Sequence, residues 1–162
     1  MTATSPMRAL RSAWQQSVEL TDQTARAGID LVEIEPLRQL VEAGGETFLD
    51  ATWTAREQRD ANGQAEGLAG KWAAKEAVMK VLQRGIGDLD PRDVEIVTEQ
   101  SGAPRVKLHR AARTIARRQR VASWSVSLTH EGGWAAAIVM ASSLRTTIAG
   151  TAAANHGGRT HG

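Results

Sequence analysis

The chain has 162 residues, with 20 Lys and Arg against 18 Asp and Glu and no cysteine. This length is enough for one ordinary domain and too short for two. The absence of cysteine excludes disulfides, thiolate metal sites and cysteine nucleophiles. The net charge of +2 gives no basis for a nucleic-acid partner. Because no apolar run approaches the roughly 20 residues that span a bilayer and the N-terminus lacks an apolar signal core, we expect a cytoplasmic protein without a membrane partner.

The two ends of the chain differ in composition from the middle. Residues 1–27 contain only a weak amphipathic spacing, so we expect an extension that is disordered or forms one amphipathic helix. Residues 142–162 are rich in small and polar side chains and predict a flexible tail. Its His156 and His161 are separated by a glycine-rich spacing that fixes no metal geometry. The domain is therefore expected to span residues 28–141.

The first half of this domain predicts one strand and three helices. Residues 29–35 alternate apolar and acidic side chains, which is typical of a half-buried strand. Residues 36–45 begin with proline and end with two glycines, which indicates a short helix. The Thr54–Glu57 sequence has the pattern of a capping box at a helix start. Residues 67–83 repeat small and apolar side chains at spacings of three and four, which predicts a longer helix with one close-packed face.

The second half changes to shorter elements. Residues 94–98 and 105–108 alternate on either side of a Ser-Gly-Ala-Pro turn and predict a hairpin. Residues 111–119 predict a basic helix, and residues 123–129 and 134–141 predict two strands joined by His-Glu-Gly-Gly. Helices and antiparallel hairpins mixed in this order indicate an α+β fold, with an antiparallel sheet packed against the long helix.

Three polar residues stand out within these elements. Glu76 and Lys80 lie one turn apart on the long helix, where a solvated ion pair is the simplest interpretation. However, alanines flank Glu76, which favours a partly buried carboxylate that needs a cation. Asp30 interrupts an apolar strand, either as an outward-facing acid at a sheet edge or as a functional group. If Asp30 and Glu76 converge, the two carboxylates suit Mg²⁺, which commonly binds through one or two carboxylates and substrate phosphates.

Other polar residues support weaker predictions. Ser127 and His130 lie at a strand end without the strand–turn–helix setting of a nucleophilic serine, so a Ser/His/Asp triad is not expected. His130 is then either an anion contact or a structural residue. Residues that could receive phosphates lie on or just after the long helix, namely Lys71, Lys75, Lys80 and the turn that begins at Gly85. From the residues alone, the hypothesis is a site for Mg²⁺ and a phosphate.

Five stretches occur in an order that is more specific than any one of them. They are Gly28-Ile-Asp-Leu-Val-Glu-Ile34, Leu68–Lys80 with its Trp-Ala-Ala-Lys-Glu-Ala, Gly85-Ile, Ser101-Gly-Ala-Pro104 and Val126-Ser-Leu-Thr-His130. Together they resemble the holo-acyl-carrier-protein synthase family, which are 4′-phosphopantetheinyl transferases. The resemblance covers essentially the whole domain. It implies transfer of the phosphopantetheine arm of coenzyme A to a serine of an apo acyl or peptidyl carrier protein, with release of adenosine 3′,5′-bisphosphate.

The same resemblance implies roles for individual residues. Asp30 and Glu76 would hold Mg²⁺ against the pyrophosphate of coenzyme A, and Glu76, or a water that it orients on the ion, would help deprotonate the carrier serine. Lys80 would stabilise charge on the leaving bisphosphate. The candidate contacts to coenzyme A are Lys71, Lys75, Lys80, Gly85, Gly102, Pro104 and His130. Because the nucleophile comes from the carrier, the chain needs positioning and charge neutralisation more than a nucleophile of its own.

The chain departs from the family pattern in places. The family's basic residue after the first strand, which contacts an acidic helix of the carrier, falls near Glu35 and Pro36, and Arg38 is the candidate replacement. Lys71 stands where many members have arginine, and Ala103 stands where many have a basic residue. Another branch of the family has two tandem copies of the fold. Since this chain has room for one copy, the resemblance implies a site between the subunits of a homotrimer.

Two other functions fit the same motifs. The first is a non-catalytic module that binds coenzyme A and the carrier protein, and the second is a Mg²⁺-dependent phosphohydrolase that breaks down coenzyme A without a carrier. The presence of Asp30, Glu76 and Lys80 together favours the transferase. Whether the carrier serves fatty-acid, polyketide or peptide synthesis is left open by the sequence.

Overall fold

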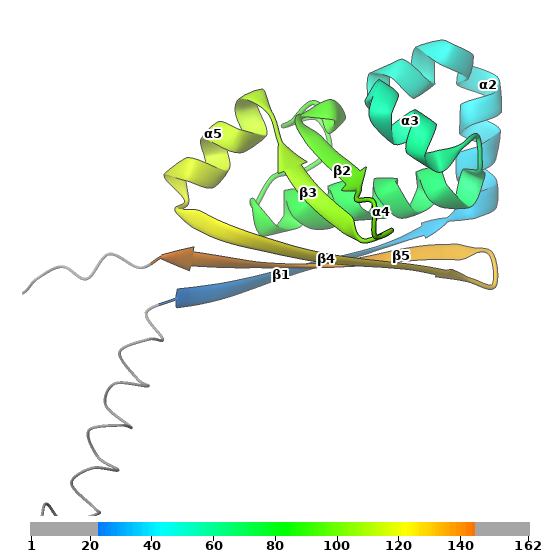
Figure 1. Ribbon diagram of the computed structural model, residues 1–162. Coiled ribbons are helices and arrows are strands. Elements are labelled where there is room, and N and C mark those ends of the chain that lie inside the picture. Colours follow the sequence, from blue (N-terminus) through cyan, green and yellow to red (C-terminus); the bar gives the residue numbers. More distant parts are fainter. Residues whose placement is uncertain (1–22, 145–162) are drawn as a thin grey trace, which may run out of the picture.

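A three-stranded antiparallel sheet forms the base of the fold (Figure 1). In the computed structural model, which describes residues 23–144, its strands lie in the order β1 (Gln23–Glu33), β5 (Trp134–Leu144) and β4 (Val121–Glu131). Helix α4 (Ala65–Val81) lies across one face of the sheet. No other helix or strand of residues 23–144 covers the opposite face. The predicted antiparallel sheet packed against a long helix is confirmed.

The remaining elements all lie on the α4 side of the sheet (Figure 1). They are α2 (Ile34–Thr52), α3 (Ala55–Ala61), the short 3-10 helix η1 (Pro91–Asp93), β2 (Val94–Thr98), β3 (Pro104–Leu108) and α5 (Arg110–Arg118). Strands β2 and β3 pair antiparallel and form the predicted hairpin. Helices α2 and α3 gather at the N-terminal end of α4, and α5 lies toward its other end. Within the described residues, no helix is long and apolar enough to cross a membrane.

The two faces of β1 are the reverse of what its alternating pattern suggests. The side chains of Ile29 and Leu31 are 66% and 57% exposed and point away from α4. Gly28, Asp30 and Val32 occupy the alternate positions and face the core. A period of two separates two faces but does not say which one is inside. The carboxylate that looked anomalous therefore lies on the inner face of the sheet.

Strand β1 packs unusually close to α4 at Gly28. A Cβ atom added at this position would lie 2.0 Å from the carbonyl oxygen of Ala77, so only glycine permits the contact. The face of α4 that meets the sheet is built from small, fully buried side chains, as its sequence predicts: Ala73, Ala74, Ala77 and Val78. This close approach brings the last two turns of α4 next to Asp30.

Helix α2 is longer than predicted. Gly45 leaves the helical conformation with a φ of 55° and a ψ of −149°, but the helix resumes and runs to Thr52. The second segment is held by a small aromatic cluster, in which the ring of Phe48 meets that of Trp53 edge-to-face at 5.8 Å between centroids. Trp53 is itself only 1% exposed. Tertiary packing therefore continues the helix beyond the glycines that were expected to end it.

The strands extend past both predicted domain boundaries. β1 begins at Gln23 and β5 ends at Leu144, and these two residues are paired in the register. Strand pairing uses main-chain hydrogen bonds, so it continues where the side chains lose their apolar alternation. The predictions for the remaining segments, including those for His156 and His161, concern residues outside 23–144.

Candidate active site

Asp30 and Lys80 form the centre of the candidate site. The Lys80 ammonium, in the last turn of α4, donates to Asp30 Oδ1 at 2.7 Å and to the main-chain oxygen of Ile29 at 2.8 Å. The Asp30 side chain is 10% exposed, whereas that of Lys80 is 53% exposed. The second carboxylate oxygen, Asp30 Oδ2, is buried and has no hydrogen-bond partner among the described residues. A buried carboxylate oxygen without a donor is costly and marks a place where a proton or cation can bind.

Glu76 lies beside this carboxylate, one turn before Lys80 on α4. Burial raises the pKa of Glu76 from its ordinary value of 4.5 to about 7, and the neighbouring Asp30 carboxylate adds to the rise, while Lys80 opposes it. Two neighbouring carboxyl groups resist ionising together, so a proton on Glu76 is stabilised beside the Asp30 carboxylate. The predicted convergence of Asp30, Glu76 and Lys80 is therefore present in the structure.

A cavity of about 190 Å³ opens next to this cluster. It is lined by Glu76, Met79, Lys80, Arg84, Gly85 and Ile86. Gly85, one of the candidate phosphate contacts, thus lines this cavity. Arg84 also lines the cavity but was not predicted, because a single arginine in the loop after a helix gives no signal in the sequence. Among the described residues, its exposed guanidinium donates a hydrogen bond only to the main-chain oxygen of Gln83. The cavity therefore has one carboxyl group and two cationic groups on its wall.

Lys75 points away from this cavity and into the core. Its ammonium is fully buried and donates to Glu57 Oε2 at 2.8 Å and to the main-chain oxygens of Pro91 and Val94 at 2.9 and 2.5 Å. Burial lowers the pKa of Lys75, and the Glu57 carboxylate opposes this. Glu57 also accepts from the main-chain nitrogen of Ile96 at 2.9 Å. The pair joins α3, α4 and β2, so in this structure Lys75 has its donors occupied by protein groups.

Lys71 is engaged in a similar way. It is 4% exposed, and its ammonium donates to the main-chain oxygen of Ile96 at 2.8 Å and to Thr98 Oγ1 at 3.1 Å. Burial lowers the pKa of Lys71, with the Asp60 carboxylate 3.7 Å away opposing this. A contact from Lys71 or Lys75 to a phosphate would require these networks to open. The structure thus gives the two lysines a role in holding β2 against α4.

His130 lies on the same face of the sheet as Asp30 but at some distance from it. Asp30 is paired with Ala137 on β5, whereas His130 on β4 is paired with Ala135. The two residues are therefore two strands apart, about 10 Å, and two positions apart along the strands, about 7 Å. His130 is exposed at the end of β4. Within one chain it does not reach the Asp30 cluster directly.

Gly102 and Pro104, two of the candidate contacts to coenzyme A, lie at the turn of the β2–β3 hairpin. Gly102 has a φ of 84°, a left-handed conformation that favours glycine, and Pro104 begins β3. Two main-chain hydrogen bonds close the turn, from Gly102 to Glu99 and from Glu99 to Ala103, both at 2.9 Å. Among the described residues, no hydrogen bond or ion pair connects this turn with Asp30, Glu76 or Lys80.

Arg38, the candidate replacement for the basic carrier contact, is occupied on its own helix. Its guanidinium is hydrogen-bonded to both carboxylate oxygens of Glu35, at 2.8 and 2.6 Å, and is ion-paired with Glu42. The hydrogen bonds from Arg38 lower the pKa of Glu35 to about 2. These three side chains together carry a net negative charge, so α2 does not present a free cation at this position.

Comparison with known proteins identifies the family. The family model of the 4′-phosphopantetheinyl transferase superfamily matches residues 26–139. The chain belongs to this superfamily. The holo-[acyl-carrier-protein] synthase of Moorella thermoacetica is 40% identical over 121 residues, which cover 72% of this chain and 93% of that protein. That of Mycobacterium ulcerans is 42% identical over 124 residues, which cover 70% and 92%.

Solved structures agree with this family assignment. The crystal structure of Helicobacter pylori holo-[acyl-carrier-protein] synthase in complex with coenzyme A is 30% identical, with a TM-score of 0.66. The match covers 72% of this chain and 99% of that chain. The structure of the Mycobacterium tuberculosis acyl carrier protein synthase is 39% identical, with a TM-score of 0.54 and coverages of 71% and 94%. The family and fold expected from the motifs are confirmed, and the superfamily match contains Asp30, Glu76 and Lys80.

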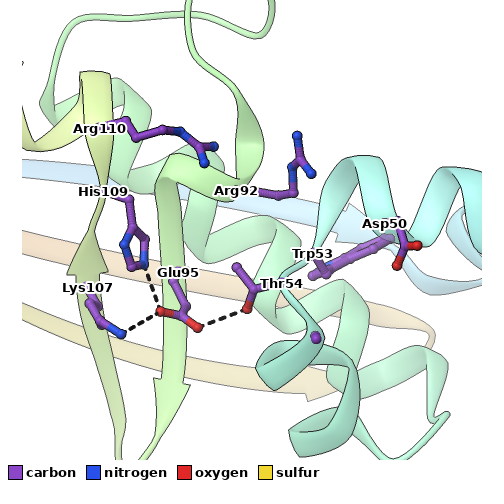
Figure 2. A pocket seen from close by; sticks show the side chains of 9 residues that line it. Asp50, Trp53, Thr54, Arg92, Glu95, Lys107, His109 and Arg110 are labelled. Carbon is purple, nitrogen blue, oxygen red and sulfur yellow. Dashed lines mark hydrogen bonds and ion pairs between the residues drawn. The ribbon is translucent and has the colours of Figure 1, made fainter.

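A larger cavity, about 500 Å³, lies elsewhere on this transferase fold and contains none of the predicted site residues (Figure 2). At its wall, Glu95 accepts hydrogen bonds from Thr54 at 2.9 Å and His109 at 2.8 Å and is ion-paired with Lys107 at 3.2 Å. Burial tends to raise the pKa of Glu95, but these three partners outweigh it and lower the pKa. The network ties the start of α3 to the β2–β3 hairpin, so its groups are satisfied by one another.

Proposed function

We propose that this chain transfers the 4′-phosphopantetheine arm of coenzyme A to a serine of an apo acyl carrier protein and releases adenosine 3′,5′-bisphosphate. The observation that carries the proposal is the convergence of Asp30, Glu76 and Lys80 beside a cavity. Two further findings support it. The relatives named above are holo-[acyl-carrier-protein] synthases over most of the chain, and the Helicobacter pylori enzyme was solved in complex with coenzyme A.

We propose Mg²⁺ as the cofactor, held by Asp30 and Glu76. The fit rests on the unpartnered Asp30 Oδ2 and on the raised pKa of Glu76, both of which a cation between the two carboxylates would relieve. The described residues contain no group of three or more His, Cys, Asp or Glu that could hold a metal. Two carboxylates suit Mg²⁺, because this ion takes its other ligands from water and substrate phosphates. When bound, it would neutralise charge on the pyrophosphate of coenzyme A.

The chain's own residues would act on the proton and on the leaving group. The carrier serine hydroxyl attacks the phosphorus that bears the pantetheine arm; the new phosphorus–oxygen bond forms as the bond to the bisphosphate breaks. Glu76, or a water that it orients, would accept the hydroxyl proton. Lys80 has three N–H donors, of which Asp30 and Ile29 take two, so the third is available to a phosphate oxygen. Arg84 can add a second positive charge at the same cavity.

We propose a homotrimer with the site completed between subunits. Large apolar side chains lie together on the outer face of the sheet. Ile29 on β1 is paired with Ile138 on β5, and Leu31 and Met140 extend this patch. The exposed fractions of Ile138 and Met140 are 46% and 52%. Contiguous apolar faces of this kind mark interaction surfaces, and a second copy of the chain is the partner that symmetric assembly predicts.

In such an assembly we propose that His130 and the turn at Gly102–Pro104 contact parts of coenzyme A that are remote from its pyrophosphate. For His130, the two perpendicular steps across and along the sheet give a separation from Asp30 of about 12 Å, which fits a contact to the far end of an extended ligand or to the next subunit. We place the reaction in the cytoplasm, as the sequence predicts. A panel of carrier proteins from fatty-acid, polyketide and peptide synthesis distinguishes the pathways that the carrier could serve.

The proposal is tested by incubating the full chain with coenzyme A, Mg²⁺ and a panel of apo carrier proteins, followed by intact-mass measurement of each carrier. We expect one carrier or more to gain the mass of one phosphopantetheine arm. Binding of coenzyme A and carrier without any mass gain would instead identify a non-catalytic module. Breakdown of coenzyme A in a reaction without carrier would identify a phosphohydrolase.

A further inference from the structure

Helix α5 concentrates positive charge on its outward side. Residues 110–120 contain five arginines and no acidic residue, although the net charge of the whole chain is only +2. The inner side of the helix is fixed by Ala112 and Ala116, which are buried in the main core. The arginines therefore lie on a rigid support rather than on a loop.

Within residues 23–144, four of these arginines have no acidic partner. Arg110 is paired with Asp90 at 3.1 Å and Asp93 at 2.7 Å. The other four are exposed and form no ion pair with any residue in 23–144: Arg113, Arg117, Arg118 and Arg120. We call these four residues the α5 arginine face.

This arrangement is not explained by the stability of the helix. Arg113 and Arg117 lie one turn apart, where like charges repel each other and weaken a helix. Arg117 and Arg118 lie in the last turn and interact favourably with the helix dipole. Neither effect accounts for Arg113 or for Arg120, which follows the helix. The face is therefore better explained by something outside the chain than by contacts within it.

Helix α2 has the opposite charge. Helix α2 contains four acidic residues and one basic residue, and that one, Arg38, is bound to Glu35 and Glu42. An acidic partner would therefore be repelled at α2 and attracted at α5. In Figure 1 the two helices lie toward opposite ends of α4.

The α5 arginine face lies at the same end of the molecule as the candidate active site. The side-chain amide of Gln119 donates to the main-chain oxygen of Leu82 at 2.8 Å. Leu82 follows α4 directly, two residues after Lys80 and two before Arg84, which both line the site cavity. A partner on the last turn of α5 would thus be near the residues that we assign to the reaction.

We propose that the α5 arginine face is a docking surface for an acidic protein surface, and that this partner is the carrier protein. The identity of the partner rests on the proposed function, whereas its acidity follows from the arginines. Guanidinium groups bind carboxylates with two parallel hydrogen bonds and are suited to such contacts. The face is confined to one helix of 9 residues and the residues just after it, which favours a local acidic surface over an extended polyphosphate chain.

The test compares two double variants of the full chain in the transfer assay. Arg113→Gln with Arg117→Gln removes two charges from the α5 arginine face. Arg56→Gln with Arg59→Gln removes the same charge from α3, at the other end of the molecule. We expect the α5 variant to raise KM for the carrier about fivefold, with kcat and KM for coenzyme A unchanged, and to weaken the salt dependence of kcat/KM. The α3 variant should leave all of these values within about twofold of the wild type.

Three further results decide between explanations. Arg113→Lys with Arg117→Lys keeps the charge and should restore most of the carrier affinity, while thermal unfolding should show both α5 variants folded. An unchanged KM for the carrier in the Gln variant overturns the proposal, as does a rise in KM for coenzyme A instead. Loss of affinity for a DNA oligonucleotide with an unchanged KM for the carrier would assign the face to nucleic acid and also overturn it. If the wild type modifies no carrier, the proposed function fails and the partner named here fails with it.

Discussion

The Glu76→Gln substitution tests whether burial and the neighbouring Asp30 carboxylate destabilise the ionised form of Glu76. In the folded chain the pKa of Glu76 is raised from 4.5 to about 7, so the folded state binds a proton that the unfolded state has released between these pH values. The free energy of unfolding therefore falls as the pH rises from about 4.5 to about 7, and the loss is complete above that. Glutamine removes the charge and keeps a side-chain N–H donor beside the Asp30 carboxylate.

The size of the effect follows from the same shift. One unit of pKa is worth about 1.4 kcal/mol, so the rise from 4.5 to about 7 has an upper limit of about 3.5 kcal/mol. Because Glu76 is partly exposed, solvent screens the interaction, and we expect about 1–2 kcal/mol. Without divalent ions, Glu76→Gln should be more stable than the wild type by this amount at about pH 8 and equally stable at about pH 4.

The assay is urea unfolding over this pH range, with a chelator and then with Mg²⁺. Mg²⁺ should stabilise the wild type at about pH 8 but have little effect on Glu76→Gln. Glu66→Gln is the matched control on the same helix, and it should lose about 0.5 kcal/mol because Glu66 lies in the favourable first turn. A Glu76→Gln protein that is less stable than the wild type at about pH 8, or stabilised equally at both pH values, would refute the reasoning.

Three other substitutions test the surroundings of the site. Lys75→Met should lower the free energy of unfolding by about 3–5 kcal/mol, because it leaves the buried Glu57 carboxylate unpaired. Adding Glu57→Gln should recover much of this loss in the same urea titration. A double variant as unstable as Lys75→Met would contradict the pairing. Gly28→Ala should destabilise the chain by about 1–3 kcal/mol through its clash with Ala77, whereas Gly70→Ala, with only Leu128 Cδ1 at 4.0 Å, should be neutral or slightly stabilising in thermal unfolding. Ile138→Lys on the outer sheet face should convert a trimer to monomers in analytical ultracentrifugation, while Arg105→Glu on the β2–β3 hairpin should leave the trimer intact. A trimer that persists in Ile138→Lys would place the interface elsewhere.

The elements that the sequence predicts well are those governed by local chemistry. The capping box at Thr54 forms as expected, with the main-chain nitrogen of Glu57 donating to the Thr54 hydroxyl at 3.3 Å and that of Thr54 donating to Glu57 Oε2 at 2.9 Å. The small-residue face of α4 is likewise visible in its spacing, since residues three and four apart share one side of a helix. The positions of Glu76 and Lys80 follow from the same spacing.

Long-range packing decides what the sequence does not show. The alternation in β1 is compatible with either face inward. The close approach of Gly28 to Ala77 and the ion pair of Asp30 with Lys80, both of them long-range contacts, show that Asp30 faces α4. Lys71 and Lys75 have no sequence signal that separates them from Lys80. Their burial depends on partners that are distant in the sequence, such as Ile96 for Lys71.

The most direct test of the site is the rate of transfer to an apo carrier protein by Asp30→Asn. Asparagine keeps the size of the side chain and can still accept a hydrogen bond from Lys80, but it removes one of the two negative charges. We predict that kcat falls at least about 100-fold, while Glu66→Gln stays within about twofold of the wild type. A folded Asp30→Asn protein that transfers phosphopantetheine at a rate close to that of the wild type would contradict the assignment of Asp30, Glu76 and Lys80 as the reaction centre.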